Sequence, residues 1–260
     1  MNFINEKEIV EFVKNENGIL LTRDYSNIKE VDFNKFTKKV LVCLTGYEKI
    51  INFFFSNIIN KINCSIILIT LETDGFKIRN EHLKHDKLKR WFTWNKSVNH
   101  EKVVALPIGL NYYRQYEILN KFLEKHKGKR KEKLLGINFS SHTNKVRQEL
   151  IKNAQTKWKS FCDILEIKKP TNIYYRKSIV DGKIKIEETN IKYYEEISNF
   201  KFVLSPPGAG LDCHRTWEAL YMDCIPIVEK SSISELYKDL PIIVVNNWNE
   251  INENFLINKY

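Results

Sequence analysis

The chain has 260 residues, of which 43% are hydrophobic and 12% aromatic, so it can bury a core and is too apolar to be intrinsically disordered. Its 42 Lys and Arg residues exceed its 32 Asp and Glu residues, which gives a formal net charge of +10. This charge favours an anionic partner, and a nucleotide, an acidic glycan and a nucleic acid all remain open on this ground.

The cysteines and the apolar runs point to a soluble protein of a reducing compartment. The five cysteines form no Cys-x-x-Cys pair, and four of them lie in or beside apolar runs, which predicts buried free thiols. The N-terminal segment lacks a basic start followed by an apolar run, and the strongest apolar stretches are far too short to span a bilayer. We therefore expect a cytoplasmic protein without a transmembrane segment.

The first half of the chain alternates predicted helices and strands. Helices are predicted over 6–14 and 47–62, and strands over 18–22, 40–45, 65–71 and 102–110. Continuous apolar strands that alternate with amphipathic helices are typical of a parallel sheet covered on both faces.

A charged segment, KFLEKHKGKRKEK at 121–133, has almost nothing to bury and predicts a solvated linker. The alternation then resumes, with an irregular stretch over 160–190 that includes a possible hairpin around 181–183. Strands are predicted over 134–140, 201–205, 224–229 and 241–245, and helices over 144–158, 192–199, 212–223, 232–239 and 248–255.

This pattern predicts an α/β protein built from two Rossmann-like, doubly wound domains that face one another across a cleft. The N-terminal domain would cover 1–120 in a pared-down form, and the C-terminal domain 134–260, with the linker 121–133 between them. Ligands of such sheets bind at the carboxyl ends of the strands.

The segment SPPGAGLDCHRTWEALYMDCIPIV at 205–228 concentrates polar residues at a loop-to-helix junction. Asp212 is a candidate N-cap for the helix. Projection at 100° per residue places Arg215 and Glu218 together, with His214 at their flank, on the side away from the core. The opposite stripe holds Cys213, Trp217, Leu220 and Cys224.

These residue types suit a nucleotide diphosphate. Gly208 and Gly210 permit close approach of the backbone and a positive φ, and free N–H groups at a helix start bind anions. His214 and Arg215 oppose the helix dipole unless a phosphate lies there, and Glu218 suits ribose hydroxyls. The alternative is a plain strand-to-helix turn with Arg215 and Glu218 as a surface pair.

The segment KFVLSPPGAGLDCHRTWEALYMDCIPIV at 201–228 closely resembles the C-terminal signature of exostosin-like glycosyltransferases. Weaker similarity extends upstream through LKRWFTWN at 88–95, ALPIGL at 105–110 and LLGINFSSHTNKVRQEL at 134–150. One departure is Asp223, where the family pattern favours Gly before Cys-Ile-Pro.

The resemblance implies a GT-B fold whose C-terminal domain binds a sugar nucleotide. By that analogy Arg215 contacts the donor diphosphate and Glu218 the ribose. The loop after the strand at 134–140 would approach the phosphates with its own donors. These donors are Ser140, Ser141, His142 and Arg147. A simple Ser, Thr or Asn cap of the following helix is the alternative for this loop.

The sequence contains no Asp-x-Asp motif, so we expect a metal-independent reaction without a further cofactor. Asp74, at the carboxyl end of the predicted strand 65–71, is a candidate general base, although Asp74-Gly75 is also a turn signal. His100 is a second candidate. Trp91, Trp94 and Asn95 could form an acceptor-sugar platform, with burial in the core as the alternative. His82 and His85 are expected to be a surface pair.

The predicted function is transfer of a sugar from a nucleotide-diphosphate sugar, uridine-linked, to a glycan or glycosylated protein, with inversion. A nucleotide-sugar or glycan-binding protein without transfer activity is one alternative. A nucleic-acid-binding protein is another, although no groove-reading module is recognisable.

Overall fold

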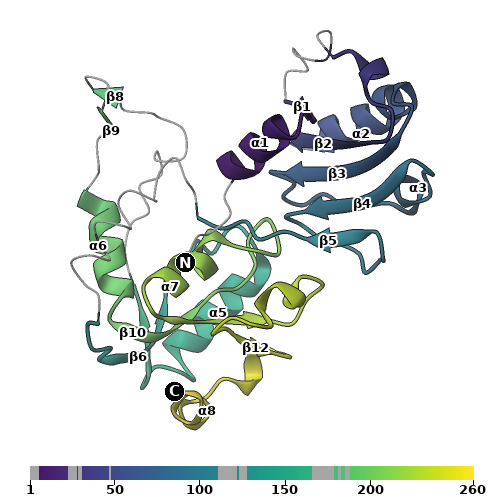
Figure 1. Ribbon diagram of the computed structural model, residues 1–260. Coiled ribbons are helices and arrows are strands. Elements are labelled where there is room, and N and C mark those ends of the chain that lie inside the picture. The colour runs from purple at the N-terminus through teal and green to yellow at the C-terminus, as the bar shows by residue number, and fades with distance from the viewer. Residues whose placement is uncertain are drawn as a thin grey trace. The chain divides into compact units, whose positions relative to one another are not determined.

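The computed structural model describes residues 6–22, 28, 31–46, 48–110, 122, 128–165, 179–180, 183–184 and 188–260. In this part of the chain, two parallel sheets of five strands each account for all strands except those of one short hairpin (Figure 1). The predicted α/β class is therefore confirmed. The chain divides into two compact units with one sheet each. Unit 1 consists of 1–109, 208–213 and 231–239, and unit 2 of 110–207, 214–230 and 240–260.

The sheet of unit 1 has its parallel strands in chain order, β1 to β5. The strands are β1 (Ile19–Leu21), β2 (Lys39–Thr45), β3 (Ser65–Leu71), β4 (Leu88–Thr93) and β5 (Val103–Ala105). Successive side chains alternate between two cores, so that Val42 and Leu44 enter one and Cys43 enters the other. The burial of both faces explains why these strands are almost continuously apolar.

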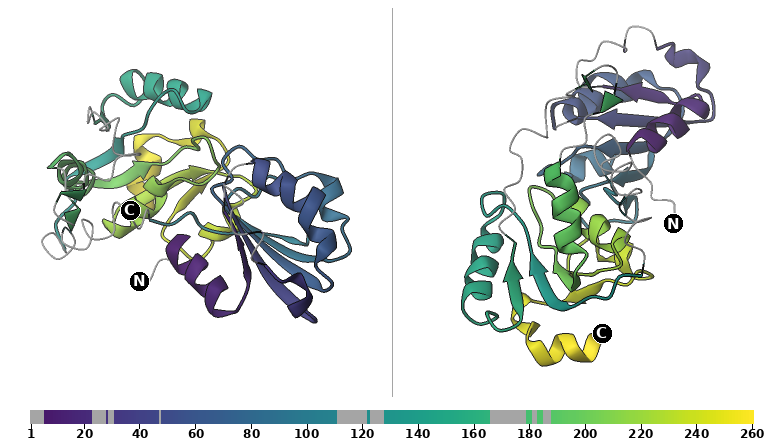
Figure 2. Two further views of the ribbon diagram at one scale, coloured as in Figure 1. Left: turned by 90° about the horizontal axis from the view of Figure 1, so that it is seen from above. Right: turned by 90° about the vertical axis from the view of Figure 1, so that its left-hand side faces the viewer.

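Helices cover both faces of this sheet (Figure 2). Helix α1 (Glu6–Asn15) packs Ile9 and Val13 into the core that contains Cys43. The other face is covered by consecutive helical pieces, of which the middle one is a π-helix. These pieces are α2 (Glu48–Phe53), η3 (Phe54–Ile58) and η4 (Ile59–Lys61). The helix predicted over 47–62 is thus present but interrupted. Two short helical segments, the 3-10 helix η2 (Phe33–Lys35) and the single-turn helix α3 (Asn80–Leu83), also belong to unit 1.

The sheet of unit 2 has the order β12-β11-β10-β6-β7, also parallel. Its strands are β6 (Lys133–Ile137), β7 (Cys162–Ile164), β10 (Phe200–Leu204), β11 (Ile225–Glu229) and β12 (Ile243–Val245). The chain leaves β6 toward β7 on one side and continues from β10 toward β12 on the other. The order therefore reverses between β6 and β10, which is the topological switch point where doubly wound sheets bind ligands.

Helices also cover both faces of the second sheet (Figure 2). One face carries α5 (Lys145–Gln155) and α8 (Glu253–Lys259), whose Leu150 and Leu256 share a core. The other face carries α6 (Glu188–Ile197) and α7 (His214–Tyr221). Both the loop that leads to α5 and the loop that leads to α7 leave the sheet at the switch point.

Several predicted elements are shorter than expected. The hairpin expected around 181–183 is present as β8 (Ile179–Val180) paired antiparallel with β9 (Lys183–Ile184). The helix predicted over 232–239 is only a 3-10 turn, η5 (Ser234–Tyr237). The one predicted over 248–255 is a 3-10 turn, η6 (Trp248–Glu250), followed by α8, because Asn247 and Asn252 each cap a new helical segment.

Six of the thirteen residues of the predicted linker 121–133 lie outside the described residues, and its last residues are bound to unit 2. The Lys131 ammonium donates to the carbonyl oxygens of Ser198 (2.7 Å) and Met222, at the C-terminal ends of α6 and α7. A cation at these positions satisfies carbonyls that the helices leave unpaired and opposes the negative end of each dipole. This end of the basic run is therefore not simply solvated.

The predicted free thiols are confirmed. Cys43, Cys64, Cys162 and Cys224 are buried and unoxidised, and Cys213 is half-buried. Burial raises the pKa of the Cys43 thiol to about 12, which suppresses its reactivity. Within the described ranges, no helix combines the length and the apolar character that crossing a bilayer requires.

Candidate functional site

Two buried arginines approach one aromatic ring at the switch point of unit 2. The loop after β6 carries Phe139, helix α5 carries Arg147 and helix α7 carries Arg215. Both guanidinium carbons lie 5.5 Å from the centroid of the Phe139 ring. The arginine side chains are only 4% and 5% exposed. Cations over a ring face are attracted by its quadrupole, which lowers the cost of burying two like charges here.

Arg147 joins the two loops of the switch point. Its Nε donates to the Pro207 carbonyl oxygen (2.8 Å), its Nη2 to that of Pro206 (3.1 Å) and its Nη1 to that of Ser140 (3.4 Å). These bonds satisfy backbone acceptors of the loops after β10 and β6. Arg147 therefore fixes the loop geometry, in addition to any contact with a ligand.

Arg215 differs from Arg147 in that one of its buried nitrogens lacks a hydrogen-bond partner. Its Nε is buried and has no hydrogen-bond partner among the described residues. An unpaired buried donor costs about 1–3 kcal/mol. The sequence predicted that Arg215 and Glu218 point away from the core, and this is wrong, because both are at most 5% exposed. The alternative of a surface ion pair fails for the same reason. Helix α7 is buried on both sides.

The carboxylate of Glu218 is held by a residue that the sequence did not single out. The Tyr193 hydroxyl, on α6, donates to Glu218 Oε2 at 3.0 Å. Burial, and next the nearby Glu218 charge, raise the pKa of Tyr193 well above its usual value, so the phenol stays a donor. Neither Arg215 nor any other described cation forms an ion pair with Glu218. We call Asn138, Phe139, Arg147, Tyr193, Arg215 and Glu218 the Arg215 cluster.

The remaining predicted residues of the first loop are more open. Ser140 and Ser141 are half-buried and His142 is exposed. Asn144 caps α5, since its side chain accepts from the Val146 N–H at 3.1 Å. The cap alternative is thus confirmed for this loop. Asn138, directly after β6, has a buried amide nitrogen without a partner in the described part of the chain.

The glycine loop belongs to unit 1, where Gly210 lies against Asp74. A Cβ at position 210 would come within 2.7 Å of Asp74 Oδ1. Neither Gly208 nor Gly210 has a positive φ, contrary to the prediction, whereas Gly75 does (73°). What position 210 requires is space for the carboxylate, not an unusual backbone conformation.

Three further hydrogen bonds hold the loop within unit 1, two of them at the carboxyl edge of the first sheet. The Leu211 N–H donates to Asn95 Oδ1 (3.3 Å), after β4. Asp212 accepts from the Ile108 N–H (2.9 Å), after β5, and from the Tyr237 hydroxyl (3.2 Å). Helix α7 begins at His214, so Cys213 occupies the N-cap position and the prediction of Asp212 placed the cap one residue too early. We call Asp74, Asn95, Ile108, Gly210, Asp212 and Tyr237 the Gly210 cluster.

The two candidate bases lie at opposite edges of the first sheet. Asp74 follows β3 in an exposed turn that the Phe76 N–H closes onto the Thr73 carbonyl (3.1 Å), so its turn character is confirmed. His100 precedes β5, and its Nδ1 accepts from the Lys102 N–H at 3.1 Å. Because the strands are parallel, His100 lies at the amino edge, away from the Gly210 cluster.

The predicted acceptor platform is largely core. Trp91 is 0% exposed and its indole N–H donates to Thr70 Oγ1 (2.9 Å), so it has no free ring face. Trp94 is buried beside Ile69 and Leu71. Asn95 is committed through Nδ2 to the Phe76 carbonyl (3.2 Å) and through Oδ1 to Leu211. The core alternative thus holds for both tryptophans.

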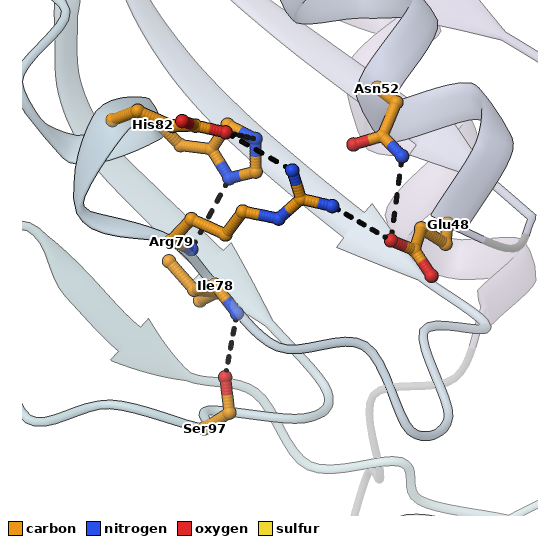
Figure 3. Close-up of polar contacts among 7 residues, drawn as sticks. Glu48, Asn52, Ile78, Arg79, His82 and Ser97 are labelled. Carbon is orange, nitrogen blue, oxygen red and sulfur yellow. Dashed lines mark hydrogen bonds and ion pairs between the residues drawn. The ribbon is translucent and has the colours of Figure 1, made fainter.

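A polar network also lies at the carboxyl edge of the first sheet (Figure 3). Arg79 contacts Glu48 and Glu81, each at 3.2 Å, and its N–H donates to His82 Nδ1. His82 is not a surface residue as predicted. It is 4% exposed and its ring stacks on Phe55 at 4.4 Å, and burial lowers its pKa. His85, which the sequence predicted to form a surface pair with His82, is instead hydrogen-bonded to Asn60 (3.3 Å).

One open cavity of about 560 Å³ lies elsewhere in unit 1. Its walls include Phe12, Lys39 and Leu41, so it is at the amino end of β2, opposite the edge that carries the Gly210 cluster. It contains no group that bears on the chemistry of either cluster. Its lining mixes apolar side chains with the basic Lys35 and Lys39 and the acidic Glu16.

Comparison with known proteins adds no assignment: no protein-family model matches the chain, and neither does any curated protein sequence. The two clusters therefore rest on their geometry and on the residue pattern alone. Phe139 and Tyr193 were missed because nothing in the local sequence distinguishes them from core aromatics.

Proposed function

We propose that the chain is a glycosyltransferase of the GT-B type that uses a nucleotide-diphosphate sugar, uridine-linked, as its donor. The observation that carries this proposal is Arg215, which is buried at the switch point with an unmatched Nε. A diphosphate supplies the paired oxygens that a guanidinium binds best. The exostosin-like pattern at 201–228 supports the same role.

The charge of the Arg215 cluster supports an anionic ligand. It contains two guanidinium groups and one carboxylate, and that carboxylate is engaged by a phenol rather than by an arginine. The first turn of α7 adds N–H groups, whose partial positive charge favours a phosphate. Glu218 then accepts hydrogen bonds from ribose hydroxyls one turn further along the helix.

In the proposed reaction, Arg215 and the α7 N-terminus stabilise the negative charge of the departing diphosphate. Asp74 is the proposed base that takes the proton of the acceptor hydroxyl, and the product is inverted. The acceptor is a glycan or a glycosylated protein. Transfer releases the nucleoside diphosphate and one proton.

Calorimetric titration with uridine, guanosine and thymidine diphosphates tests the donor site. We expect Arg215→Ala to weaken binding about 10- to 100-fold, because a hydrogen bond to a charged group contributes about 1.5–3 kcal/mol. Arg215→Lys should recover only part of the loss, because it keeps the charge without the forked geometry. Arg130→Ala, at an exposed position, is the control and should bind as the wild type does.

Release of nucleoside diphosphate from a uridine-linked sugar, measured with and without a glycan acceptor, tests the reaction. Acceptor-dependent release supports a transferase. Tight nucleotide binding without release under any acceptor would indicate the binding-protein alternative. Absence of binding by all three nucleotides would overturn the donor site itself.

A further inference from the structure

We propose that Tyr193 is a positioning residue that makes the nucleotide site selective for ribonucleotides over 2′-deoxyribonucleotides, by holding Glu218 in place to accept from the ribose hydroxyls. This inference rests on the proposed function. The Tyr193 hydroxyl lies 3.0 Å from Glu218 Oε2.

The geometry leaves one oxygen of Glu218 available. Oε2 accepts from Tyr193, while Oε1 receives no hydrogen bond from the described residues. A carboxylate has about four acceptor sites, so it can accept from a ligand while it accepts from Tyr193.

Glu218 needs this support because, among the described residues, no cation pairs with its carboxylate and fixes its rotamer. No described Lys, Arg or His lies within ion-pairing distance of it, although Arg215 is one helical turn away. The Tyr193 ring is itself held, since it packs at 5.1 Å from the ring of the buried Tyr194. A fixed donor behind Oε2 orients Oε1, and preorganised acceptors discriminate better than mobile ones.

A ribonucleotide and its 2′-deoxy analogue differ by one donor, the 2′-hydroxyl. The ratio of their affinities therefore measures how well Glu218 accepts a hydrogen bond from that group. We expect the wild type to bind uridine diphosphate about tenfold more tightly than 2′-deoxyuridine diphosphate, as one hydrogen bond to a charged group allows. In Tyr193→Phe this preference should fall to about twofold. Because the diphosphate is common to both ligands, an altered contact with Arg215 changes both affinities by the same factor and leaves their ratio unchanged.

The experiment is calorimetric titration of both nucleotides, and of the matching guanosine pair, into four proteins. These are the wild type, Tyr193→Phe, Glu218→Gln and the double variant. We expect the double variant to show the same ratio as Glu218→Gln alone, because the two residues act through one carboxylate. Tyr260→Phe makes the same chemical change at an exposed site and should keep the wild-type ratio.

Any of four results would overturn the inference. An unchanged ratio in Tyr193→Phe, with nucleotide still bound, would overturn it alone and leave the proposed function standing. Equal affinities of the two nucleotides for the wild type would do the same. If no nucleotide binds the wild type, the proposed function fails together with it. If Tyr193→Phe does not fold, the affinity ratio of the two nucleotides in Glu218→Gln decides. A wild-type ratio in that variant would show that the Glu218 carboxylate does not discriminate the two sugars, which would overturn the inference.

Discussion

The carboxylate of Asp74 occupies the space that a side chain at position 210 would need, since Oδ1 lies 2.7 Å from where a Cβ of that residue would be. The two residues are far apart in sequence and come from the turn after β3 and the loop after β10. Their contact means that Asp74, considered as a base from its sequence position, also has a structural partner.

Gly210→Ala should therefore destabilise the protein by about 1 kcal/mol, at the low end for overpacking, because the exposed Asp74 side chain can turn aside. In an Asp74→Ala background the same change should cost markedly less. Urea unfolding of the four proteins of this cycle measures the coupling. Gly136→Ala is the control. Its Cβ would meet the Phe200 ring at 2.8 Å, so Asp74→Ala should not relieve its cost.

Asp74→Asn separates the two roles of Asp74. Asparagine has nearly the same shape, so we expect the free energy of unfolding to change by less than about 0.5 kcal/mol. If Asp74 is the base, transfer should fall about 10²- to 10⁴-fold while nucleotide affinity is kept. Wild-type transfer by this variant would eliminate Asp74 as the base and leave only its contact with Gly210.

Lys131→Met should destabilise unit 2 by about 1–3 kcal/mol, because it removes the cation that satisfies the carbonyls of Ser198 and Met222. Methionine keeps most of the aliphatic length, so the loss reports on the charge and its hydrogen bonds. Lys129→Met, at an exposed site, is the matched control. Equal unfolding free energies for the two variants would show that Lys131 contributes no more than a solvated lysine.

His82 should make stability fall on acidification. Burial lowers its pKa below 6.5 in the folded state, so the unfolded chain binds more protons once the pH drops below 6.5. The contribution of His82 to the free energy of unfolding is therefore full above pH 6.5 and is lost as the pH falls toward the folded-state pKa. His82→Phe keeps a ring against Phe55 and should flatten this slope. His142→Ala, at an exposed site, should retain it, and an unchanged slope in His82→Phe would contradict the assignment.

The Lys96–Glu235 pair should make stability depend on pH in a more acidic range than His82 does. The hydrogen bond from Lys96 to Glu235, at 2.8 Å, lowers the pKa of Glu235 below the usual 4.5. A carboxylate with a depressed folded-state pKa stabilises above 4.5 and loses that contribution as the pH falls below it. The difference in unfolding free energy between wild type and Glu235→Gln should thus be present at pH 7 and shrink below pH 4.5. A constant difference across this range would exclude the pair as its source.

Long apolar strands were the most predictable part of the fold. The strand predicted over 65–71 has those bounds, because both of its faces are buried and every residue type agrees. Strand β4 was missed, since consecutive exposed Lys89 and Arg90 and an irregular pairing with β3 break its pattern. The predicted doubly wound sheets require a reversal of strand order, which occurs in unit 2, whereas the described strands of unit 1 pair in chain order. Which strands pair depends on long-range packing and not on where the strands begin.

The candidate site was predictable in its residues but not in their surroundings. Arg215 and Glu218 were identified from their spacing on one helix face, yet that face is buried because α6 brings Tyr193 against it. Likewise, helical projection cannot show that Gly210 faces Asp74, since the contact joins segments more than a hundred residues apart. Local pattern gives the residue types of a site, while long-range packing decides what each of them contacts.

Because 208–213 and 231–239 belong to unit 1, this unit is assembled from three stretches of the chain. During translation, the chain that emerges first carries the whole first sheet but lacks the segments that bind Asp74, Asn95, Ile108 and Lys96. Unit 1 can thus be completed only once residue 239 has left the ribosome, although its sheet is synthesised before that of unit 2.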